Sequence, residues 1–402
     1  MTSSAKSRSN PGGRRFESDN FVRVLHVHTR YRQRGGEDTV VELERSLLER
    51  SGFEVEKLDF FNPSSTLATA AALARSPSNT PASKEVVDKA RDFEADVVHI
   101  HNTWFALSPA VIRDLHRHGF PVVMTFHNYR LVCANAMLFR DGRPCEDCVG
   151  GSPLPGVIHR CYRGSFFSSA MVAVTIETHR RRSTWSEHLS VAIALTDFAR
   201  TRLLQGGLPP ERTIVKPNFA IDPGPRSNPP SASKRVLYVG RLSSEKGVIH
   251  LVEAWSQANM PDLELMLIGA GPQADEIRDR SGPSLHLAGP LTPEQVREEM
   301  LGARALIVPS IWYEGQPMVV LEALAAGLPV WRTDMGALAE TAGRGGVSLG
   351  DGQVTTLADA LQPLDNGGLL DRVGVAAREE FEHRYTPERA IEALRQIYRM
   401  VP

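Results

Sequence analysis

The sequence predicts an α/β protein made of two Rossmann-like domains, each with a doubly wound parallel sheet, that face each other across a cleft. Three observations predict this fold. The chain of 402 residues is too long for one ordinary core. Apolar strand-like segments alternate with amphipathic helical segments in both halves. A stretch rich in Pro and Ser at residues 223–233, PGPRSNPPSAS, separates the halves as a linker.

Composition limits the function. The formal net charge of −1 gives no basis for nucleic-acid binding, which usually leaves a strongly basic domain or stripe. No apolar run reaches the roughly 18 residues of a transmembrane segment. Residues 1–20 are rich in Ser, Arg and Gly and lack an apolar h-region, so we expect a disordered tail and no signal peptide. We therefore expect a cytoplasmic protein, with peripheral contact at the inner membrane surface left open.

The most informative stretch is PSIWYEGQPMVVLEALAAGLP at residues 309–329. Pro317 suits a first helical turn and Gly327 suits the position after the last turn, so the pattern predicts a short helix over residues 317–326. The other side chains of this helix are apolar, which is typical of a buried helix. Glu322 therefore places a carboxylate in apolar surroundings, where it needs a compensating partner.

A vicinal diol, such as that of a ribose, would suit Glu322, because a carboxylate offers two acceptor oxygens and a diol offers two donors. Glu314 lies ahead of the helix and gives the spacing E-x7-E. A purely structural pair is the alternative. Glu314 would then cap the helix dipole, and Glu322 would pair with an arginine.

The segment EGQPMVVLEALAAGLPV resembles the donor-site signature of the retaining GT-B glycosyltransferases of family 4, also called group 1. The resemblance implies that Glu322 holds the ribose of a nucleotide-diphosphate sugar. It also implies that Glu314, with Gly315 beside it, meets the hydroxyls of the transferred sugar. This nucleotide sugar would be a donor substrate, and no catalytic cofactor is expected. The likeness covers almost the whole chain after residue 20.

The N-terminal half begins with a predicted strand at residues 21–28 (FVRVLHVH) and a predicted helix at residues 39–52. Gly35 and Gly36 lie directly before that helix, where free backbone N–H groups favour an anion or a sugar hydroxyl. The turn lacks G-x-G-x-x-G, which disfavours a dinucleotide oxidoreductase. The resemblance places the Gly-Gly loop near the donor phosphate and the acceptor, whereas an ordinary glycine turn is the alternative.

Further strands are predicted at residues 55–58, 95–101 and 121–126, with a variable loop containing some helix at residues 60–84. His127 follows a strand end, and ligands bind beyond the carboxyl ends of such strands. The resemblance places His127 near the transferred sugar.

His101 and Asn102 are expected to be weaker neighbours of this site. His99 and His101 share one face of their strand, which suggests a metal, but a hydrogen-bonded core role is the preferred interpretation. Arg180–Arg182 end a predicted helix at residues 165–185. We take them as a solvated helix end, and contact with an anionic lipid or an acceptor phosphate is the alternative.

The C-terminal half restarts the pattern with a predicted strand at residues 234–240, followed by RLSSEKG. Arg241 and Lys246 lie in this loop ahead of a helix, and two cations at such a place suit a diphosphate. The loop closely matches the diphosphate-binding loop of the family, so the resemblance implies that both cations stabilise the leaving group. In the alternative, Glu245 neutralises Lys246.

The donor site draws on three more segments. Gly269 and Gly271 follow a predicted strand at residues 263–268, and their small size would let the backbone approach a ligand. The resemblance implies that Leu291 lies where the nucleobase contacts main-chain groups. It also implies that Asn218, in IVKPNFAID, borders the donor site.

All four cysteines fall in one segment, with the spacing C-x11-C-x2-C-x12-C. Four clustered thiolates suit a closed, structural zinc site, and His159 is a possible substitute ligand. Free buried thiols, a labile disulfide or a redox pair are the alternatives, and together they carry about the same weight as zinc. The four residues are Cys133, Cys145, Cys148 and Cys161.

These segments divide the chain into consecutive parts. They are a tail (1–20), an acceptor-side domain (21–222) with a cysteine-rich insertion (133–161), the linker (223–233), a donor domain (234–384) and a terminal helix (385–402) that, as in GT-B proteins, crosses back onto the first domain.

The resemblance thus implies a retaining hexosyltransferase that uses a nucleotide-diphosphate sugar. Its acceptor would be a glycan, a lipid-linked sugar or a small molecule, in cell-envelope polysaccharide synthesis or secondary-metabolite glycosylation. One alternative is another GT-B enzyme that acts on a nucleotide sugar, such as an epimerase. A second alternative is a non-catalytic subunit that binds sugar nucleotides.

Overall fold

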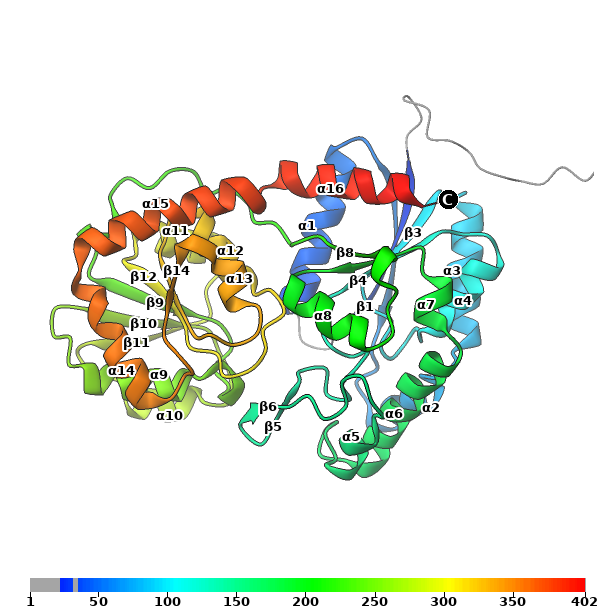
Figure 1. Cartoon of the computed structure of the whole chain (residues 1–402), viewed down its shortest axis with the longest axis horizontal. Coiled ribbons are helices and arrows are strands. Elements are labelled where there is room, and N and C mark those ends of the chain that lie inside the picture. Colours follow the sequence, from blue (N-terminus) through cyan, green and yellow to red (C-terminus); the bar gives the residue numbers. More distant parts are fainter. Residues whose placement is uncertain (1–21, 32–34, 402) are drawn as a thin grey trace, which may run out of the picture.

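Two separate parallel sheets organise the protein. The computed structural model describes residues 22–31 and 35–401. Within them lie two six-stranded parallel sheets and one two-stranded ribbon. Figure 1 shows the two sheets in two lobes, with the N-terminal half in one lobe and most of the C-terminal half in the other. This arrangement confirms the predicted α/β class. The predicted disordered tail lies outside the described residues.

The N-terminal sheet has the strand order β2-β1-β3-β4-β7-β8. Its inner strands are short apolar runs, as expected for parallel strands buried on both faces. Leu25 and Val98 pack with α3 (Thr80–Asp92) and α4 (Ala110–Arg117), whereas their neighbours Val24 and Val97 pack with α1 (Gly36–Arg50) and α16 (Pro387–Met400). The strands are β1 (Arg23–Arg30), β2 (Glu54–Phe61), β3 (Val97–Ile100), β4 (Val122–Phe126), β7 (Val191–Ala194) and β8 (Thr213–Val215).

Eight helices of the described residues and the small ribbon complete this half of the chain. The ribbon pairs β5 (Phe139–Arg140) with β6 (Arg143–Pro144) inside the cysteine-rich insertion. The helices are α1 (Gly36–Arg50), α2 (Thr66–Arg75), α3 (Thr80–Asp92), α4 (Ala110–Arg117), α5 (Leu154–Ile158), α6 (Phe166–Arg181), α7 (Thr184–His188) and α8 (Asp197–Gln205).

The C-terminal sheet has the strand order β11-β10-β9-β12-β13-β14. Its strands are β9 (Arg235–Val239), β10 (Glu264–Ile268), β11 (Leu285–Gly289), β12 (Ala305–Val308), β13 (Val330–Arg332) and β14 (Gly346–Ser348). Its helices are α9 (Val248–Ala258), α10 (Ala274–Asp279), α11 (Pro293–Gly302), α12 (Met318–Ala325), α13 (Leu338–Ala342), α14 (Val354–Leu361), α15 (Gly367–Arg384) and α16 (Pro387–Met400).

Some elements differ from the sequence prediction. Residues 60–84 contain the helix expected there, but they are more regular than the predicted loop: they include the end of β2, all of α2 and the start of α3. The side chains of Val86 and Ala90 in α3 are fully buried in the N-terminal core, so tertiary packing stabilises a helix whose local pattern is weak. The edge strands β8 and β14 are also new. Each has only three residues, too few to show a pattern.

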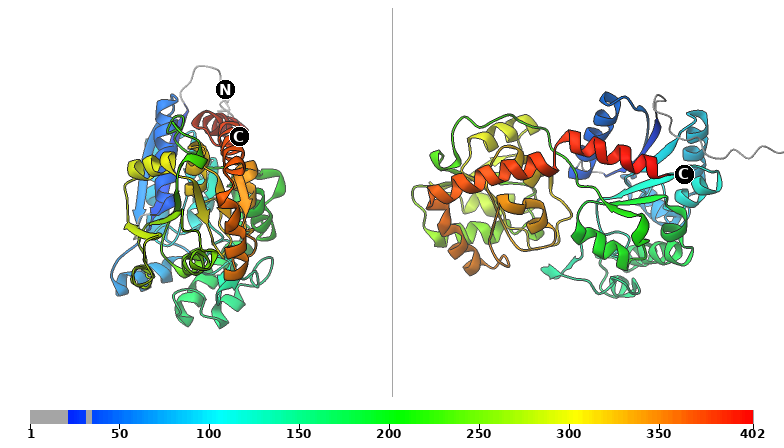
Figure 2. Two further views of the ribbon diagram at one scale, coloured as in Figure 1. Left: turned by 90° about the vertical axis from the view of Figure 1, so that its left-hand side faces the viewer. Right: turned by 45° about the horizontal axis from the view of Figure 1, so that its top comes forward.

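The terminal helix α16 lies over the N-terminal lobe, although the chain enters it from the C-terminal lobe (Figure 2). Its apolar side joins the cluster formed by α1 and the N-terminal sheet. The hydroxyl of Tyr398 lies 2.8 Å from Nδ1 of His99 in β3. In the described part of the chain, no helix is both long and apolar enough to cross a membrane.

The glycines after β10 serve a contact within the protein. A Cβ on Gly269 would lie 1.9 Å from the carbonyl oxygen of Gly240, and one on Gly271 would lie 2.2 Å from that of Leu242. The backbone after β10 therefore packs directly on the RLSSEKG loop. Their small size therefore serves this loop contact, and the ligand approach predicted from the sequence stays a prediction.

We expect Gly271→Ala to destabilise the protein, because every close atom that the new methyl group would meet is backbone of Leu242. Overpacking of this kind costs about 1–3 kcal/mol. Urea unfolding would measure the change. Gly302→Ala is the matched control, since a Cβ there meets nothing within 4 Å. Equal stability of the two variants would contradict this packing.

Candidate functional site

A cavity of about 1100 Å³ lies between the two lobes. Gly35 and Gly36 line it from the N-terminal half, and Arg241 and Lys246 line it from the C-terminal half. Four residues predicted for the site thus reach one cavity. Because the two sheets present their strand ends to this space, the cavity lies where ligands bind in doubly wound folds.

Lys246 forms the central ion pair of the cavity wall. Its Nζ lies 2.7 Å from Oε1 of Glu314, and Ser310 Oγ donates to the same oxygen at 2.7 Å. The ring of Trp312 lies 5.3 Å from Nζ, as a cation–π contact. The structure therefore joins two predicted site residues that are far apart in the sequence.

Arg241 pairs with a different carboxylate. Its guanidinium donates to Oε1 of Glu245 and to Oγ of Ser243. The alternative in which Glu245 neutralises Lys246 is therefore wrong, since Glu245 pairs with Arg241 instead. The side chain of Arg241 is 58% exposed, so it remains accessible from the cavity.

Glu322 lies in α12, whose boundaries follow the prediction: Pro317 is the N-cap, Ala326 is the C-cap and Gly327 has a φ of +60°. Burial raises the pKa of Glu322, and the distant charge of Arg297 opposes this shift. Among the described residues, none forms a hydrogen bond or ion pair with the Glu322 side chain. The structural pairing with an arginine is therefore not found.

Residues predicted from the two halves also meet at the edge of the cleft. A Cβ on Gly315 would lie 3.4 Å from the carbonyl oxygen of His127, and the backbone N–H of Asn218 donates to Oε1 of Gln316 at 2.6 Å. His127 and Gly315 line a second, much smaller cavity, not the large one. His127 is thus close to the E-x7-E loop, but it does not line the large cavity.

Two other residues predicted near the site, Asn102 and Leu291, make contacts within their own lobes. Asn102 donates to the carbonyl oxygen of Thr29 at 3.0 Å and accepts from the N–H of Trp104 at 2.9 Å, so it secures the end of β3. Leu291 packs against the C-terminal core, while Pro293, two residues later, lines the large cavity.

The basic end of α6 is tied to its own helix. Glu177 pairs with Arg180 at 2.5 Å and with Arg181 at 2.6 Å. This is the solvated helix end that the sequence favoured.

Sequence reasoning did not identify the aromatic residues in the N-terminal wall of the cavity. Trp104, Phe105 and Tyr162 line it, and the guanidinium of Arg130 lies 5.1 Å from the Tyr162 ring centroid and 5.5 Å from that of Phe105. Trp104 and Phe105 follow the carboxyl end of β3, which was the available signal. Tyr162 comes from the cysteine-rich insertion and had none.

Glu37, which sequence reasoning did not single out, is a largely buried carboxylate beside the Gly35-Gly36 turn that lines the cavity. It lies in the first turn of α1, its side chain is only 10% exposed, and Asn128 Nδ2 donates to it at 3.4 Å. Burial raises the pKa of Glu37 to about 8. The sequence signal was its place directly after Gly35-Gly36.

The four cysteines lie around one small cavity as free thiols. Burial raises the pKa of the Cys148 thiol to about 11 and also raises that of Cys161. Within the described ranges, the ligand atoms close enough to hold a metal, all within 4.8 Å of one another, belong to His26, Glu44, His99 and His101 and not to the cysteines. The cysteines thus cluster as expected, but their geometry does not support a structural zinc.

Comparison with known proteins gives a consistent result at the level of families. The model described as "Glycosyl transferase 4-like domain" matches residues 8–218, which is more than half of the chain. The model described as "Glycosyl transferases group 1" matches residues 233–365.

Similar proteins include glycogen synthase of Mycobacterium tuberculosis, which is 28% identical over 262 residues, or 61% of this chain and 63% of that protein. The match thus spans less than two thirds of that relative. The putative teichuronic acid biosynthesis glycosyltransferase TuaC of Bacillus subtilis is 34% identical over 116 residues, 29% of this chain and 28% of that protein.

Solved structures show the same fold at low sequence identity. Sucrose-phosphate synthase from Thermosynechococcus elongatus has a TM-score of 0.69 at 17% identity, covering 94% of this chain and 98% of that one. Anabaena HepE in complex with UDP and glucose has a TM-score of 0.62 at 16% identity, covering 93% and 98%. The chain therefore has the GT-B fold.

Glu37 should make stability fall as pH rises. The folded protein holds its carboxyl proton up to about pH 8, whereas the unfolded chain releases it near the ordinary value of 4.5. Between these values the unfolded state binds fewer protons, so the free energy of unfolding decreases with pH. We expect Glu37→Gln to gain stability relative to the wild type between about pH 5 and pH 9, measured by urea unfolding.

Glu388→Gln is the control, because Glu388 is exposed in the first turn of α16. The difference between this variant and the wild type should stay constant over the same pH range. A constant difference for Glu37→Gln as well would show that Glu37 ionises normally.

Proposed function

Because the chain belongs to the group 1 glycosyl transferases with a glycosyl transferase 4-like N-terminal domain, we propose that it is a retaining hexosyltransferase of the GT4 type. It transfers a sugar from a nucleotide-diphosphate donor to a hydroxyl group of an acceptor. The observation that carries the proposal is the cavity between the lobes, where Arg241 and Lys246 face the Gly35-Gly36 turn. HepE was solved with UDP and glucose, which supports a nucleotide-sugar donor.

The C-terminal wall binds the donor. Arg241 and Lys246 contact the diphosphate, and Glu322 accepts hydrogen bonds from the ribose diol. Burial raises the pKa of Glu322, and two hydroxyl donors would compensate its ionised form. Glu314 holds Lys246 in place and meets the hydroxyls of the sugar, and Gly315 leaves room beside it.

The reaction breaks the bond between the anomeric carbon and the diphosphate oxygen, so negative charge grows on the departing phosphate. The two cations stabilise this charge most strongly in the transition state. In this proposal Glu314 holds Lys246 through Oε1 and accepts from the sugar hydroxyls, so no enzyme nucleophile is assigned. The acceptor hydroxyl therefore attacks from the face that the diphosphate leaves and gives its proton to the departing phosphate. This route retains the anomeric configuration.

An epimerase acting on the same donor and a non-catalytic sugar-nucleotide-binding subunit are the competing functions. One experiment separates them from the transferase. Purified protein is first screened for thermal stabilisation by UDP, GDP and ADP sugars, since a ligand of the folded state raises stability. The best donor is then incubated with and without pools of candidate acceptors. Release of nucleoside diphosphate only when an acceptor is present supports transfer, and its absence with every acceptor pool contradicts it.

Glu322→Gln should weaken donor binding while the protein stays folded. The amide keeps the shape of the side chain but loses a charged acceptor, which costs about 1.5–3 kcal/mol of binding free energy. Calorimetric titration with the stabilising nucleotide measures this. Glu340→Gln is a control for the general effect of removing a carboxylate, because Glu340 bonds backbone N–H groups of α8 outside the cavity. An unchanged dissociation constant for Glu322→Gln would exclude the ribose contact.

Lys246→Met should lower kcat by about a hundredfold or more, with a smaller rise in KM, because the charge it meets is largest in the transition state. Lys246→Arg, which keeps the charge, should retain part of the rate. Lys234→Met is the matched control, since Lys234 is exposed outside the cavity. A rise in KM alone would show that Lys246 binds the ground state and the transition state equally and does not lower the barrier of the chemical step.

A further inference from the structure

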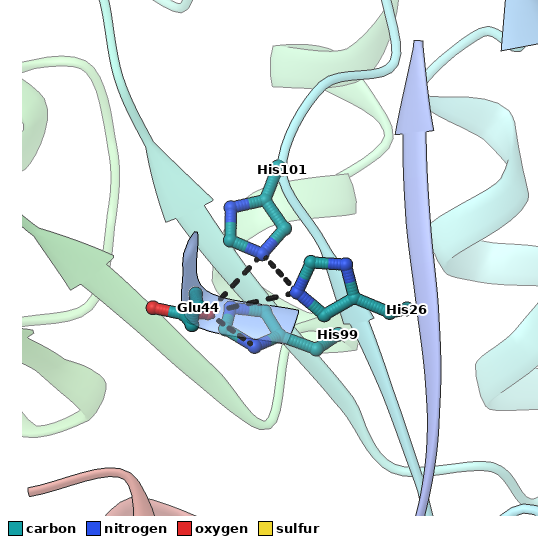
Figure 3. A group of neighbouring side chains, drawn as sticks. All are labelled: His26, Glu44, His99 and His101. Atoms are coloured by element: carbon teal, nitrogen blue, oxygen red, sulfur yellow. Dashed lines mark hydrogen bonds and ion pairs between the residues drawn. The ribbon is translucent and has the colours of Figure 1, made fainter. Parts of the chain in front are cut away.

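A buried cluster of three histidines lies under the cleft, on the face of the N-terminal sheet that α1 covers. His26 from β1 and His99 and His101 around β3 surround the carboxylate of Glu44 from α1 (Figure 3). All four side chains are at most 2% exposed. Oε1 of Glu44 lies 3.3 Å from Nε2 of His101, 3.4 Å from Nδ1 of His99 and 3.7 Å from Nε2 of His26.

The cluster is balanced in charge by Lys216, which donates to the other oxygen of Glu44. Burial alone would raise the pKa of Glu44, but Lys216 and the histidines hold it well below its usual value. Burial lowers the pKa of His99 to about 3 and places that of His101 well below the usual range. At neutral pH, one carboxylate and one ammonium group therefore neutralise each other among neutral imidazoles.

A hydrogen-bonded chain leads from this cluster to His127. Nε2 of His26 lies 2.8 Å from Nε2 of His101, and Nδ1 of His101 lies 2.9 Å from Nε2 of His127. The rings of His101 and His127 are stacked at 5.2 Å. Burial also lowers the pKa of His127 to about 3, so the three linked rings each carry one proton.

This chain has only two proton arrangements. Each N···N hydrogen bond needs one proton between its two atoms. If His101 carries its proton on Nε2, its Nδ1 must accept, and His127 must donate from Nε2. If His101 carries its proton on Nδ1, then His127 must accept at Nε2 and hold its proton on Nδ1. The tautomer of His101 therefore fixes the tautomer of His127.

Glu44 selects between the two arrangements. Its Oε1 has no hydrogen-bond partner of good geometry among the described residues, and His101 Nε2 is the nearest of the ring nitrogens to it. A proton on that nitrogen bonds Nε2 of His26 and lies close enough to the carboxylate for its charge to stabilise it, whereas a lone pair there is repelled by that charge. The charge of Glu44 therefore favours the first arrangement, in which His26 accepts at Nε2.

We propose that Glu44 and His101 act as positioning residues that hold His127 in the tautomer with its proton on Nε2, leaving Nδ1 as a hydrogen-bond acceptor. This step rests on the proposed function: Nδ1 accepts a hydrogen bond from a hydroxyl of the transferred sugar, which would extend from the large cavity into the small one that His127 and Gly315 line. The tautomer is set before the sugar binds, so no rearrangement of protons is needed at that step. Preorganised hydrogen-bonding groups are worth most inside such a water-poor site.

The direct test is the protonation pattern of the histidines in the wild-type protein. Long-range proton–nitrogen correlation spectra of protein labelled with nitrogen-15 in its 13 histidines distinguish the two tautomers of each ring. The His127→Asn variant assigns the His127 signals by their loss. We expect a proton on Nε2 in both His127 and His101. A proton on Nδ1 of His127 would overturn the proposal, whether or not the protein transfers sugar.

A pair of variants tests the consequence for activity. His101→Phe keeps a ring in place but removes both links of the chain. His99→Phe is the matched control, since His99 is equally buried and bonds Tyr398 and Thr125 but not His127. We expect both to lose stability, but only His101→Phe to lose about tenfold in kcat, with KM for the donor changed less. Equal losses of kcat would mean that the cluster only supports the fold.

A metal ion is the competing occupant, because the four ligand atoms lie within 4.8 Å of one another. A divalent ion would add two positive charges beside Lys216, which disfavours it. Elemental analysis of protein purified without chelator settles this point. Absence of a stoichiometric metal supports the hydrogen-bonded chain. About one bound ion per protein chain would overturn it, because the ring nitrogens would then hold the metal in place of protons.

Discussion

The ion pair between Lys246 and Glu314 is the interaction on which the site depends. It joins the loop after β9 to the loop after β12, and the nearly complete burial of Glu314 makes a partner necessary. The hydroxyl of Tyr129, from the N-terminal half, reaches the backbone oxygen of Glu314 at 3.4 Å. The buried carboxylate of Glu314 therefore holds in place the ammonium group of Lys246, which faces the cavity. The backbone of Glu314 also lies where the two lobes touch.

The same constraint recurs under the N-terminal wall. Glu44 and Lys216 are both almost fully buried and form an ion pair across 172 positions of sequence. Breaking such a pair leaves an uncompensated charge in the core, so both partners must stay. The pair holds α1 against the segment after β8, and α1 begins at the Gly35-Gly36 turn that lines the cavity. A buried electrostatic contact thus supports each wall.

Local features of the sequence predicted much of this architecture. Apolar runs such as VVMTF gave the buried parallel strands, and Pro317 with Gly327 gave the limits of α12, because caps and strand patterns act over a few residues. Features that depend on residues distant in the sequence were not predicted. The glycines after β10 pack on another loop, and α3 is stabilised by the core it enters. The clustering of the cysteines was visible from their spacing, but their mutual geometry was not.

The anomeric configuration of the product tests the central claim most directly. The stabilising nucleotide sugar and a productive acceptor are incubated with the enzyme, and proton NMR of the new glycosidic linkage is compared with that of the donor. Attack from the face that the diphosphate leaves, stabilised by Arg241 and Lys246 in one cavity, predicts the same anomeric configuration in product and donor. An inverted linkage, or a donor returned as its epimer without transfer, would contradict it.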